Sequence, residues 1–494
     1  MLDFNDMKNN KILYFLFSVV VLMSSCSKDY LNIEPQSTIN SDQLGRSPSA
    51  TMGILKGVYS SLRSYGSSGY AGHEDFGHKA VLSFIDLMGN DVIMDYLNWG
   101  GFNYNYTGRV MTNDRSHMPW FTYYTQIKNL NTVINSVSHD TEDPELKAIL
   151  GQALALRGYF HFMLARIYGH TYVGNENKAC IPINAATLSS KRNTNEEVYQ
   201  QIVADLTEGV NLLSGYSRGS SKELLDKGVA EAFLADVYLE MGKYPEAATL
   251  AKNARTGYNL LSESGWQNGF YDLNQNETMW GADINAELTT FVASFFAHFD
   301  NTNPSGYSGR GNISIDRRLY DAMSSSDIRK PMFASADSTS YSVGQHTLKY
   351  GPYISFKFRD LTTDRRQGDY IYLRSSLLYF IEAEALARSN KEAEARDVLF
   401  EITTTRDNSY VKSSNSGDAL IDEIILQKRI ELWGEGFAWF DLKRLKKGVV
   451  RDYPGSNHAT YGKLNIPVGD NRFLFMIPQA EVDANPDILP NNPQ

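Results

Sequence analysis

The chain has 494 residues, of which 42% are hydrophobic and 21% are charged, and its formal net charge at pH 7 is −10. Such a composition is typical of a folded globular protein and excludes a disordered chain or one built of membrane-spanning helices. The negative charge argues against a nucleic-acid partner, because such binding depends on neutralising phosphates. Thirty Tyr, 24 Phe and six Trp provide many rings, which build cores and also stack on sugars and peptides.

Residues 1–25 have the features of a secretory signal peptide. Two lysines precede an apolar run from Ile12 to Met23, which is too short to span a bilayer, since that needs about 20 residues. Two aspartates near the start are unusual in such a segment, so we expect translation to begin at Met7. Cys26 follows two serines, an arrangement that resembles a lipoprotein cleavage site and implies that Cys26 becomes the lipidated N-terminus. The alternative is an ordinary secretory peptide with an incidental cysteine.

The residues after Cys26 predict a tether followed by one domain. Residues 26–49 are interpreted as the lipid anchor and a polar, flexible tether, and residues 50–494 as a single domain. The other cysteine, Cys180, has no disulfide partner if Cys26 carries lipid. Its setting, Ala-Cys-Ile-Pro, predicts a small buried residue rather than a nucleophile.

Most of the chain has the apolar periodicity of α-helices. We expect helices or helix pairs at Thr51–Leu62, Trp120–Val137, Pro144–Tyr168, Glu196–Leu213, Val229–Tyr258 and Leu373–Thr405. The Val229–Tyr258 stretch resembles a tetratricopeptide unit, because small residues such as Ala247 and Ala251 recur where two helices must approach closely. Residues with similar spacing recur near Ala165 and Ala383, but the units are too far apart along the chain for a tandem array. They predict helix pairs of one superhelical scaffold interrupted by insertions, with a generic helical bundle as the alternative.

The stretch Leu420–Leu445 predicts one further helix. Apolar residues recur at steps of four, three, four and three from Leu426 to Phe440, so a single helical face carries them. Lysines and arginines gather at its end, where a helix C-terminus favours positive charge, and a glycine follows as a stop. Gly434 and Gly436 each cost about 1 kcal/mol inside a helix. Their presence predicts a close helix contact or a bend.

Two long segments, Ser64–Asn113 and Phe291–Gly311, lose helical periodicity and are rich in aromatic and polar residues. Long loops in a compact domain are usually functional or disordered, and these contain too many rings for disorder. Rings beside amide side chains suit the apolar face and the hydroxyls of a sugar, and we expect the two insertions to meet at one cleft. The candidate ligand-binding residues are Tyr96, Asn98, Trp99, Tyr104 and Tyr307. The alternative is that these rings only pack the insertions onto the body of the protein.

Three motifs resemble signatures of the SusD/RagB family of outer-membrane nutrient-binding lipoproteins. They are Glu431-Leu432-x-x-Glu435-Gly436 continued by Asp441-Leu442-x-Arg444, then Arg157-Gly158-Tyr159-Phe160-His161-Phe162, and the closing Ile477-Pro478 with Glu481 and Asn485-Pro486. The chain departs from the first motif at Gln427-Lys428, where the family usually has Glu-Arg, and at Ala438, which is often Arg. With the tetratricopeptide-like unit, the resemblance extends over essentially the whole mature chain.

The resemblance implies a mostly α-helical, SusD-like fold, with a tetratricopeptide-like scaffold, long irregular insertions and a few short strands. It implies a short strand at Thr278–Ala282, with Trp280 in the core, and a contribution of the first insertion to ligand binding. It further implies a protein on the cell surface of the outer membrane that captures oligosaccharides, with peptides as the alternative ligand. The implied partner is a SusC-like TonB-dependent outer-membrane barrel.

The sequence has no motif specific to a catalytic, metal or cofactor site. A nucleophile elbow and a phosphate loop are absent, and the glycines near Gly306 lack the spacing of a dinucleotide turn. His73 and His78 are five residues apart with a glycine between them, whereas a zincin helix needs a spacing of four. We therefore expect a binding protein without metal or cofactor. Acidic pairs such as Asp86 with Asp91 leave a secreted glycoside hydrolase as the rival hypothesis.

Overall fold

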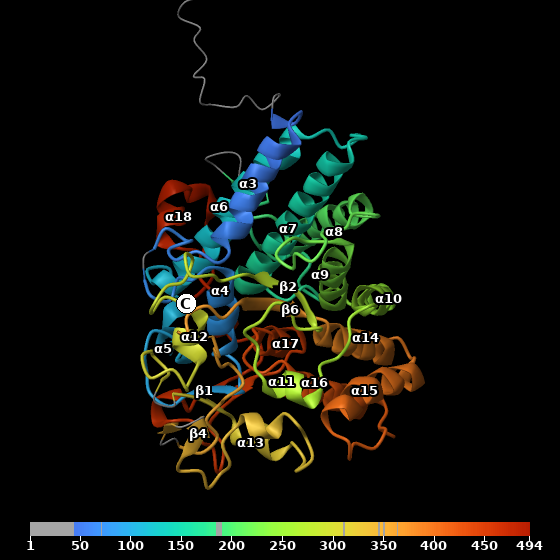
Figure 1. Cartoon of the computed structure of the whole chain (residues 1–494). Helices are drawn as coiled ribbons and strands as arrows, with labels where there is room; N and C mark the ends of the chain where they lie inside the picture. The colour runs from blue at the N-terminus through green and yellow to red at the C-terminus, as the bar shows by residue number, and fades with distance from the viewer. Residues whose placement is uncertain are drawn as a thin grey trace, which may run out of the picture.

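The computed structural model describes residues 44–70, 72–183, 190–309, 312–343, 346–348, 351–362 and 364–494. The predicted signal peptide, Cys26 and most of the predicted tether lie outside these residues. Within the described ranges the chain is mostly helical with a few short strands, as the sequence predicted (Figure 1).

The long helices form a scaffold in which they pack in the order in which they occur along the chain. They are α3 (Pro48–Ser61), α6 (Asp114–Ser136), α7 (Pro144–Tyr168), α8 (Asn195–Leu212), α9 (Lys227–Glu240), α10 (Tyr244–Arg255), α14 (Ser376–Arg388) and α15 (Glu392–Arg406). Contacts join α6 to α7, α7 to α8, α8 to α9, α9 to α10, α10 to α14 and α14 to α15. In Figure 1 this series runs as an arc from the top of the molecule down its right side. The expected helix pairs and their tetratricopeptide-like arrangement are confirmed.

Local sequence signals set the ends of these helices. Asp143 accepts hydrogen bonds from two backbone N–H groups at the start of α7, and Pro144 occupies the first helical position, where no donor is needed. Thr194 and Glu197 form a reciprocal capping box at the start of α8. Ala247 of α10 is fully buried, and α10 packs against α9, as the small-residue pattern required.

The remaining elements lie mainly in the insertions and the C-terminal region. The helices are α4 (His78–Asp86), α5 (Gly101–Tyr104), α11 (Glu263–Gln267), α12 (Phe295–Phe299), α13 (Arg317–Asp321), α16 (Gly417–Glu431), α17 (Ala438–Arg444) and α18 (Gln479–Ala484). The strands are β1 (Val92–Met94), β2 (Thr278–Ala282), β3 (Ile313–Ile315), β4 (Tyr341–Val343), β5 (His346–Leu348), β6 (Tyr370–Arg374), β7 (Val449–Val450) and β8 (Asn465–Ile466). In two-stranded antiparallel sheets, β1 pairs with β3, β2 with β6, β4 with β5 and β7 with β8. The expected strand at Thr278–Ala282 is β2, and Trp280 is buried in the core as predicted.

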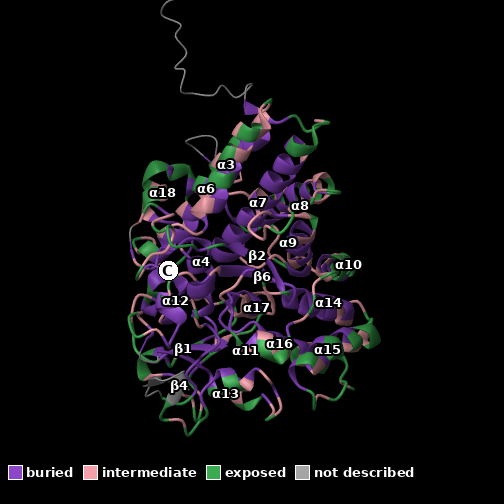
Figure 2. Ribbon diagram, in the orientation of Figure 1, coloured by how far each residue is buried: buried purple, intermediate pink, exposed green. Residues whose placement is uncertain are grey.

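α4 in the first insertion has no counterpart among the predicted helices. All nine of its residues are buried, and Figure 2 shows it within the purple interior of the molecule. Even Lys79 is inside, where its Nζ donates to the carbonyl oxygen of Ile371 at 2.8 Å. Lys79, Ser83 and Asp86 recur at helical spacing in α4, but the helix has only nine residues and lies in a Gly-rich insertion, so this short pattern was not recognised.

The prediction of one continuous helix over Leu420–Leu445 is wrong. α16 and α17 are separate helices joined by a turn. Gly434 and Gly436 in that turn have φ values of 76° and 101°, which a helix does not allow. A Cβ on Gly436 would lie 2.7 Å from the Cβ of Leu82 in α4, so the turn also brings the chain unusually close to that helix. Both expected reasons for the two glycines, a bend and a close contact, are present.

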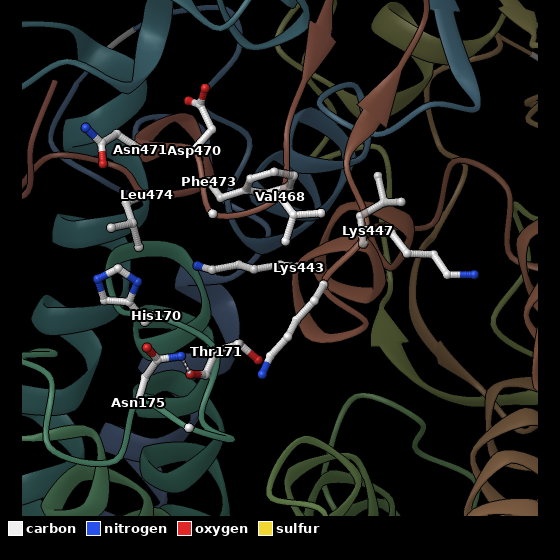
Figure 3. Close-up of a pocket in the computed structure, with 14 residues that line it drawn as sticks. His170, Thr171, Asn175, Lys443, Lys447, Val468, Asp470, Asn471, Phe473 and Leu474 are labelled. Carbon is white, nitrogen blue, oxygen red and sulfur yellow. Dashed lines mark hydrogen bonds between the residues drawn. The ribbon is translucent and has the colours of Figure 1, made fainter. Parts of the chain in front are cut away.

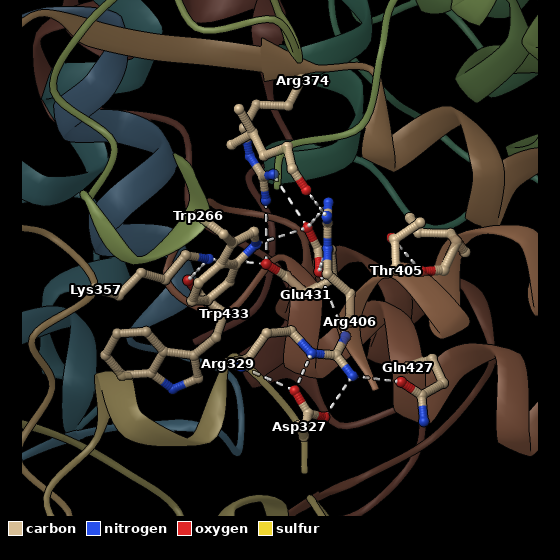
Figure 4. Close-up of polar contacts among 12 residues, drawn as sticks. Trp266, Asp327, Arg329, Lys357, Arg374, Thr405, Arg406, Gln427, Glu431 and Trp433 are labelled. Atoms are coloured by element: carbon tan, nitrogen blue, oxygen red, sulfur yellow. Dashed lines mark hydrogen bonds and ion pairs between the residues drawn. The ribbon is translucent and has the colours of Figure 1, made fainter. Parts of the chain in front are cut away.

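The end of α16 carries a buried ion cluster, shown in Figure 4. Glu431 is fully buried, and its carboxylate accepts hydrogen bonds from Arg374, Arg406 and Trp266, each at 3.1 Å. Arg329 adds an ion pair at 3.4 Å. These partners come from β6, the end of α15, α11 and the segment after α13, so one carboxylate joins four distant parts of the chain.

Neighbouring pairs complete the charge balance of this cluster. Glu435, in the turn after α16, accepts N–H bonds from Lys357 at 2.6 Å and from Arg374 at 2.7 Å. The members are four carboxylates and four cations, Glu277, Asp327, Glu431, Glu435, Arg329, Lys357, Arg374 and Arg406. Because every charge has an opposite partner, the cluster avoids the cost of an isolated buried ion.

Candidate functional site

The pairing of β1 with β3 brings the two aromatic insertions together. In this antiparallel register Met94 lies opposite Ile313, so the residues that follow β1 emerge beside the residues that precede β3. The pairing continues beyond the strands, since the N–H of Asp95 donates to the carbonyl oxygen of Asn312 at 2.8 Å. The side-chain oxygen of Asn312 accepts the N–H of Tyr96 at 2.7 Å. The expected meeting of the two insertions is confirmed, and a cleft between them stays a prediction.

The two insertions meet in an aromatic cluster, defined as His73, Tyr96, Trp99 and Tyr307. The Trp99 ring centroid lies 5.6 Å from that of His73 and 6.3 Å from that of Tyr307. The Tyr96 hydroxyl donates to the carbonyl oxygen of Tyr307 at 2.6 Å, and the His73 Nδ1 contacts the Tyr307 hydroxyl. Tyr96 is 41% exposed and the other three are half-buried. Rings that keep part of their surface open can stack on the apolar face of a sugar or on a peptide.

Buried polar residues contact the aromatic cluster from the interior of the protein. Arg115 of α6 donates to the carbonyl oxygen of Trp99 and forms an ion pair with Glu74 at 2.8 Å. The ring of His298, in α12, stacks on Tyr307 with centroids 4.8 Å apart. Burial lowers the pKa of His298 to about 3, so this ring is neutral at physiological pH. Because helices carry both supports, the exposed rings are held in one arrangement before any ligand arrives.

Four of the five predicted binding residues lie in or next to the aromatic cluster. Tyr96, Trp99 and Tyr307 belong to it, and Asn98 lies between the first two in the sequence. The side-chain oxygen of Asn98 accepts the N–H of Gly100 at 3.1 Å, which shapes the turn that presents Trp99. Among the described residues, none provides a hydrogen-bond partner for the Nδ2 of Asn98. Contact of these four side chains with a ligand stays a prediction.

Tyr104 lies in the core, and its prediction as a ligand contact is therefore wrong for this structure. Its ring is fully buried at the end of α5 and stacks on His458, with centroids 5.9 Å apart. Its hydroxyl lies 2.6 Å from the Nδ1 of His458. Phe102 on the same short helix is 46% exposed. Composition identified α5 as aromatic, but one helical turn is too short for periodicity to reveal which ring faces inward.

His73 is a member of the aromatic cluster that the sequence reasoning missed, because it considered this residue only as a metal ligand paired with His78. The two side chains have separate partners. His78 is buried in α4, where its ring nitrogens lie 2.8 Å from the Tyr123 hydroxyl and 3.2 Å from the Tyr159 hydroxyl. Burial lowers the pKa of His78 to about 3. The available signal for His73 was its position inside the first aromatic insertion.

Asp86 and Asp91, the acidic pair considered for hydrolysis, both have structural partners. The carboxylate of Asp91 accepts two hydrogen bonds from Arg429, at 2.9 and 2.5 Å. Asp86 accepts the N–H of Ala438 at 3.0 Å, and burial raises its pKa to about 7. Both carboxylates are buried, and they tie the first insertion to α16 and α17. Cys180 is also buried, and burial raises the pKa of its thiol to about 12, as expected of a core residue rather than a nucleophile.

The fold and the aromatic cluster define a helical-repeat protein with an exposed aromatic surface assembled from two insertions. Residues 29–239 match a family model described as starch-binding and associating with the outer membrane, and residues 301–494 match a model described as the SusD family. The chain belongs to the SusD/RagB family. This membership supports a nutrient-binding role and an association with the outer membrane. No helix in the described part of the chain is long and apolar enough to cross a membrane.

Relatives of similar length support this assignment. SusD-like protein P2 of Formosa agariphila is 26% identical over 422 residues, which cover 76% of this chain and 79% of that protein. A SusD-like carbohydrate binding protein from Bacteroides vulgatus has a similar structure, with a TM-score of 0.78, 23% identity and coverage of 91% of this chain and 98% of that one. A SusD superfamily protein from Bacteroides thetaiotaomicron gives a TM-score of 0.73 at 23% identity, with coverage of 91% and 100%. The two structures share the fold with this chain.

Proposed function

We propose that this protein is a lipid-anchored, cell-surface protein of the outer membrane that binds oligosaccharides and does not transform them. The observation that carries the proposal is the aromatic cluster, whose rings are supported from beneath yet remain partly open to solvent. Flat rings with neighbouring polar groups suit the apolar face and the hydroxyls of a sugar. The resemblance in fold to a protein described as carbohydrate binding supports this choice of ligand class.

Peptides are the alternative ligand, because the same rings also stack on peptide side chains. A glycoside hydrolase is disfavoured, since two carboxylates must flank the scissile bond. The pair considered from the sequence, Asp86 and Asp91, is buried and engaged with Ala438 and Arg429.

Binding of a panel of oligosaccharides and peptides, combined with product analysis, tests this proposal. At least one oligosaccharide should bind the purified protein, and no new reducing ends should appear after prolonged incubation. Binding confined to peptides would favour the alternative ligand. The appearance of shortened products would overturn the assignment as a binding protein.

We further propose that Cys26 carries the lipid anchor and that the protein delivers its ligand to a SusC-like TonB-dependent barrel. The cleavage context before Cys26 supports the anchor. Each buried CH₂ of an acyl chain contributes about 0.8 kcal/mol, so more than one chain gives stable anchoring. A binder outside the cell needs a separate protein for passage inward, and family membership supports a barrel as that protein.

Affinity purification from detergent-solubilised outer membranes tests the anchor and the partner together. The wild-type protein should be recovered in the membrane fraction together with a barrel, whereas Cys26→Ala should appear in the soluble fraction without it. A Cys26→Ala variant that stays with the membranes after a high-salt wash would contradict the anchor. Repeated recovery of the wild-type chain alone would contradict the partner.

A further inference from the structure

A cavity elsewhere in the molecule differs in character from the aromatic cluster and shares no residue with it. It has a volume of about 260 Å³ and lies where the loop after α7 meets the end of α17 (Figure 3). Its lining includes His170, Asn175, Lys443, Lys446, Asp470 and Phe473. Sites for drug-sized ligands usually measure about 300–1,000 Å³. This cavity therefore suits a smaller molecule, of about the size of a monosaccharide.

Lys443 provides a fixed donor inside the cavity. Its Nζ donates to the carbonyl oxygens of Arg166 at 2.6 Å and Gly169 at 2.7 Å, at the end of α7. Burial lowers the pKa of Lys443 to about 7, so below that pH its side chain is an ammonium group with three donors, of which one is left after these two bonds. In Figure 3 the amino group of Lys443 points toward His170 and Leu474, whereas that of Lys447 points away from them.

Several positively charged side chains lie near His170, which lines the cavity. Burial, and after it the nearby charges of Lys443, Lys178 and Arg192, lower the pKa of His170 to about 4. The acidic lining residue, Asp470, pairs with Arg472 at 2.8 Å, so its charge is already compensated.

Lys446 occupies a backbone position that favours glycine. The N–H of Lys446 donates to the carbonyl oxygen of Lys443 at 3.2 Å, and the N–H of Lys447 donates to that of Leu442 at 2.8 Å. These bonds form the motif that commonly ends a helix with a left-handed glycine. Lys446 has a φ of 52°, a left-handed conformation that is strained for a residue with a Cβ. A strained backbone at the rim of a cavity points to a role for the side chain.

The side chain of Lys446 lines the cavity opposite the loop after α7. Its Nζ lies 3.8 Å from the position that a Cβ on Gly174 would take. Glu176, which also interacts with the charge of Lys446, accepts the N–H of Gly174 at 2.9 Å. Lys446, and below about pH 7 also Lys443, thus provide charged donors, and Phe473 and Leu474 provide an apolar wall.

We propose that this cavity is a second binding site, which takes a compact oxyanion, free or carried on a monosaccharide-sized molecule, with Lys446 and Lys443 as its charged contacts. A carboxylate or sulfate accepts several N–H donors at once, and such charge-assisted hydrogen bonds are among the stronger ones in proteins. The site does not depend on whether the aromatic cluster binds oligosaccharides.

Calorimetric titration in low-salt buffer tests the proposal, with glucuronate, glucose and inorganic sulfate as probes. Glucuronate should bind the wild-type protein and glucose should not. Lys446→Gly should weaken glucuronate binding roughly tenfold, as expected for the loss of one charge-assisted hydrogen bond. The same variant should unfold at an unchanged or higher temperature, because glycine adopts this φ without strain. A loss of affinity in this variant cannot then be attributed to misfolding.

Asn390→Gly is the matched control, because Asn390 follows α14 with a φ of 60° and does not line the cavity. It should leave glucuronate binding unchanged. Equal binding of glucose and glucuronate, or an unchanged affinity in Lys446→Gly, would overturn the proposal. Sulfate binding as tight as that of glucuronate would support the oxyanion site and identify its ligand as a free anion rather than one carried on a sugar.

Discussion

Glu431→Gln is expected to lower the free energy of unfolding by about 3–5 kcal/mol, the range for breaking a buried ion pair. The change keeps the shape of the side chain but removes its charge, so the guanidinium groups of Arg374, Arg406 and Arg329 lose a shared partner. An amide group also points an N–H toward these donors. Urea denaturation, followed by a spectroscopic signal of the tryptophans, measures the effect.

The stability difference between wild type and Glu431→Gln should also depend on pH. Burial raises the pKa of Glu431, but the charges of Arg406, Arg374 and Arg329 outweigh it and hold the pKa well below its usual range. A depressed pKa contributes stability above the pKa of the unfolded state, about 4.3, and this contribution is lost as the pH falls. The difference should therefore shrink in strong acid. Glu394→Gln, at an exposed pair with Lys391, is the control and should change the midpoint little. Equal midpoints for wild type and Glu431→Gln would contradict the importance of the ion cluster.

Trp99→Ala is expected to weaken oligosaccharide binding roughly thirtyfold, which corresponds to about 2 kcal/mol for the loss of a stacking ring. Trp99 is half-buried, and among the described residues the rings that it contacts are those of His73 and Tyr307 in the aromatic cluster. The unfolding temperature should therefore change little. Calorimetric titration with the best ligand from the panel, together with thermal unfolding, measures both quantities.

Two further variants test whether the loss of oligosaccharide affinity results from the loss of ring stacking. Trp99→Phe keeps a flat ring and should lose less affinity than Trp99→Ala. Phe400→Ala removes a ring of α15 that is 36% exposed and contacts Tyr410, so it should leave binding unchanged. A large drop in unfolding temperature with unaltered affinity would identify Trp99 as a packing residue and refute its role at the site.

The scaffold could be predicted from the sequence because its helices are long and their ends carry clear signals. α7 was expected at Pro144–Tyr168 and has these bounds, since Pro144 and Asp143 mark its start clearly. α4 has only nine residues inside a Gly-rich insertion, too short a pattern to be recognised. In Leu420–Leu445 the apolar spacing continued through Gly434 and Gly436, so periodicity alone could not reveal the turn between the two helices.

The departures of the chain from the family-like motif also have a physical explanation in the structure. Lys428 is buried and pairs with Asp441 at 2.8 Å, so a cation still meets that carboxylate. Gln427 accepts a hydrogen bond from Arg329 at 2.7 Å, and its amide oxygen can do so without a negative charge. Arg444 pairs with Glu384 of α14 at 2.7 Å.

The candidate site was only partly predictable, because its members lie far apart in the sequence. Composition identified both aromatic insertions, and the flat-ring-plus-amide chemistry identified Trp99. The inward position of Tyr104 and the participation of His73 depend on the pairing of β1 with β3 and on the packing of α5. Three-residue strands have too little periodicity to be recognised, so the sequence could not supply this geometry.

The β1–β3 pairing positions the two insertions through the backbone, whereas their side chains determine what the site can bind. The two strands are joined through backbone hydrogen bonds, and of the side chains beside them Asn312 adds a bond to the N–H of Tyr96. Side chains that follow Met94 or precede Ile313, other than Asn312, can therefore be exchanged while the ends of the two insertions stay in register. A binder built in this way can acquire a new specificity through a few substitutions at the rim, with its folding determinants left untouched. The same property makes the rim a suitable starting point for engineering recognition of chosen glycans.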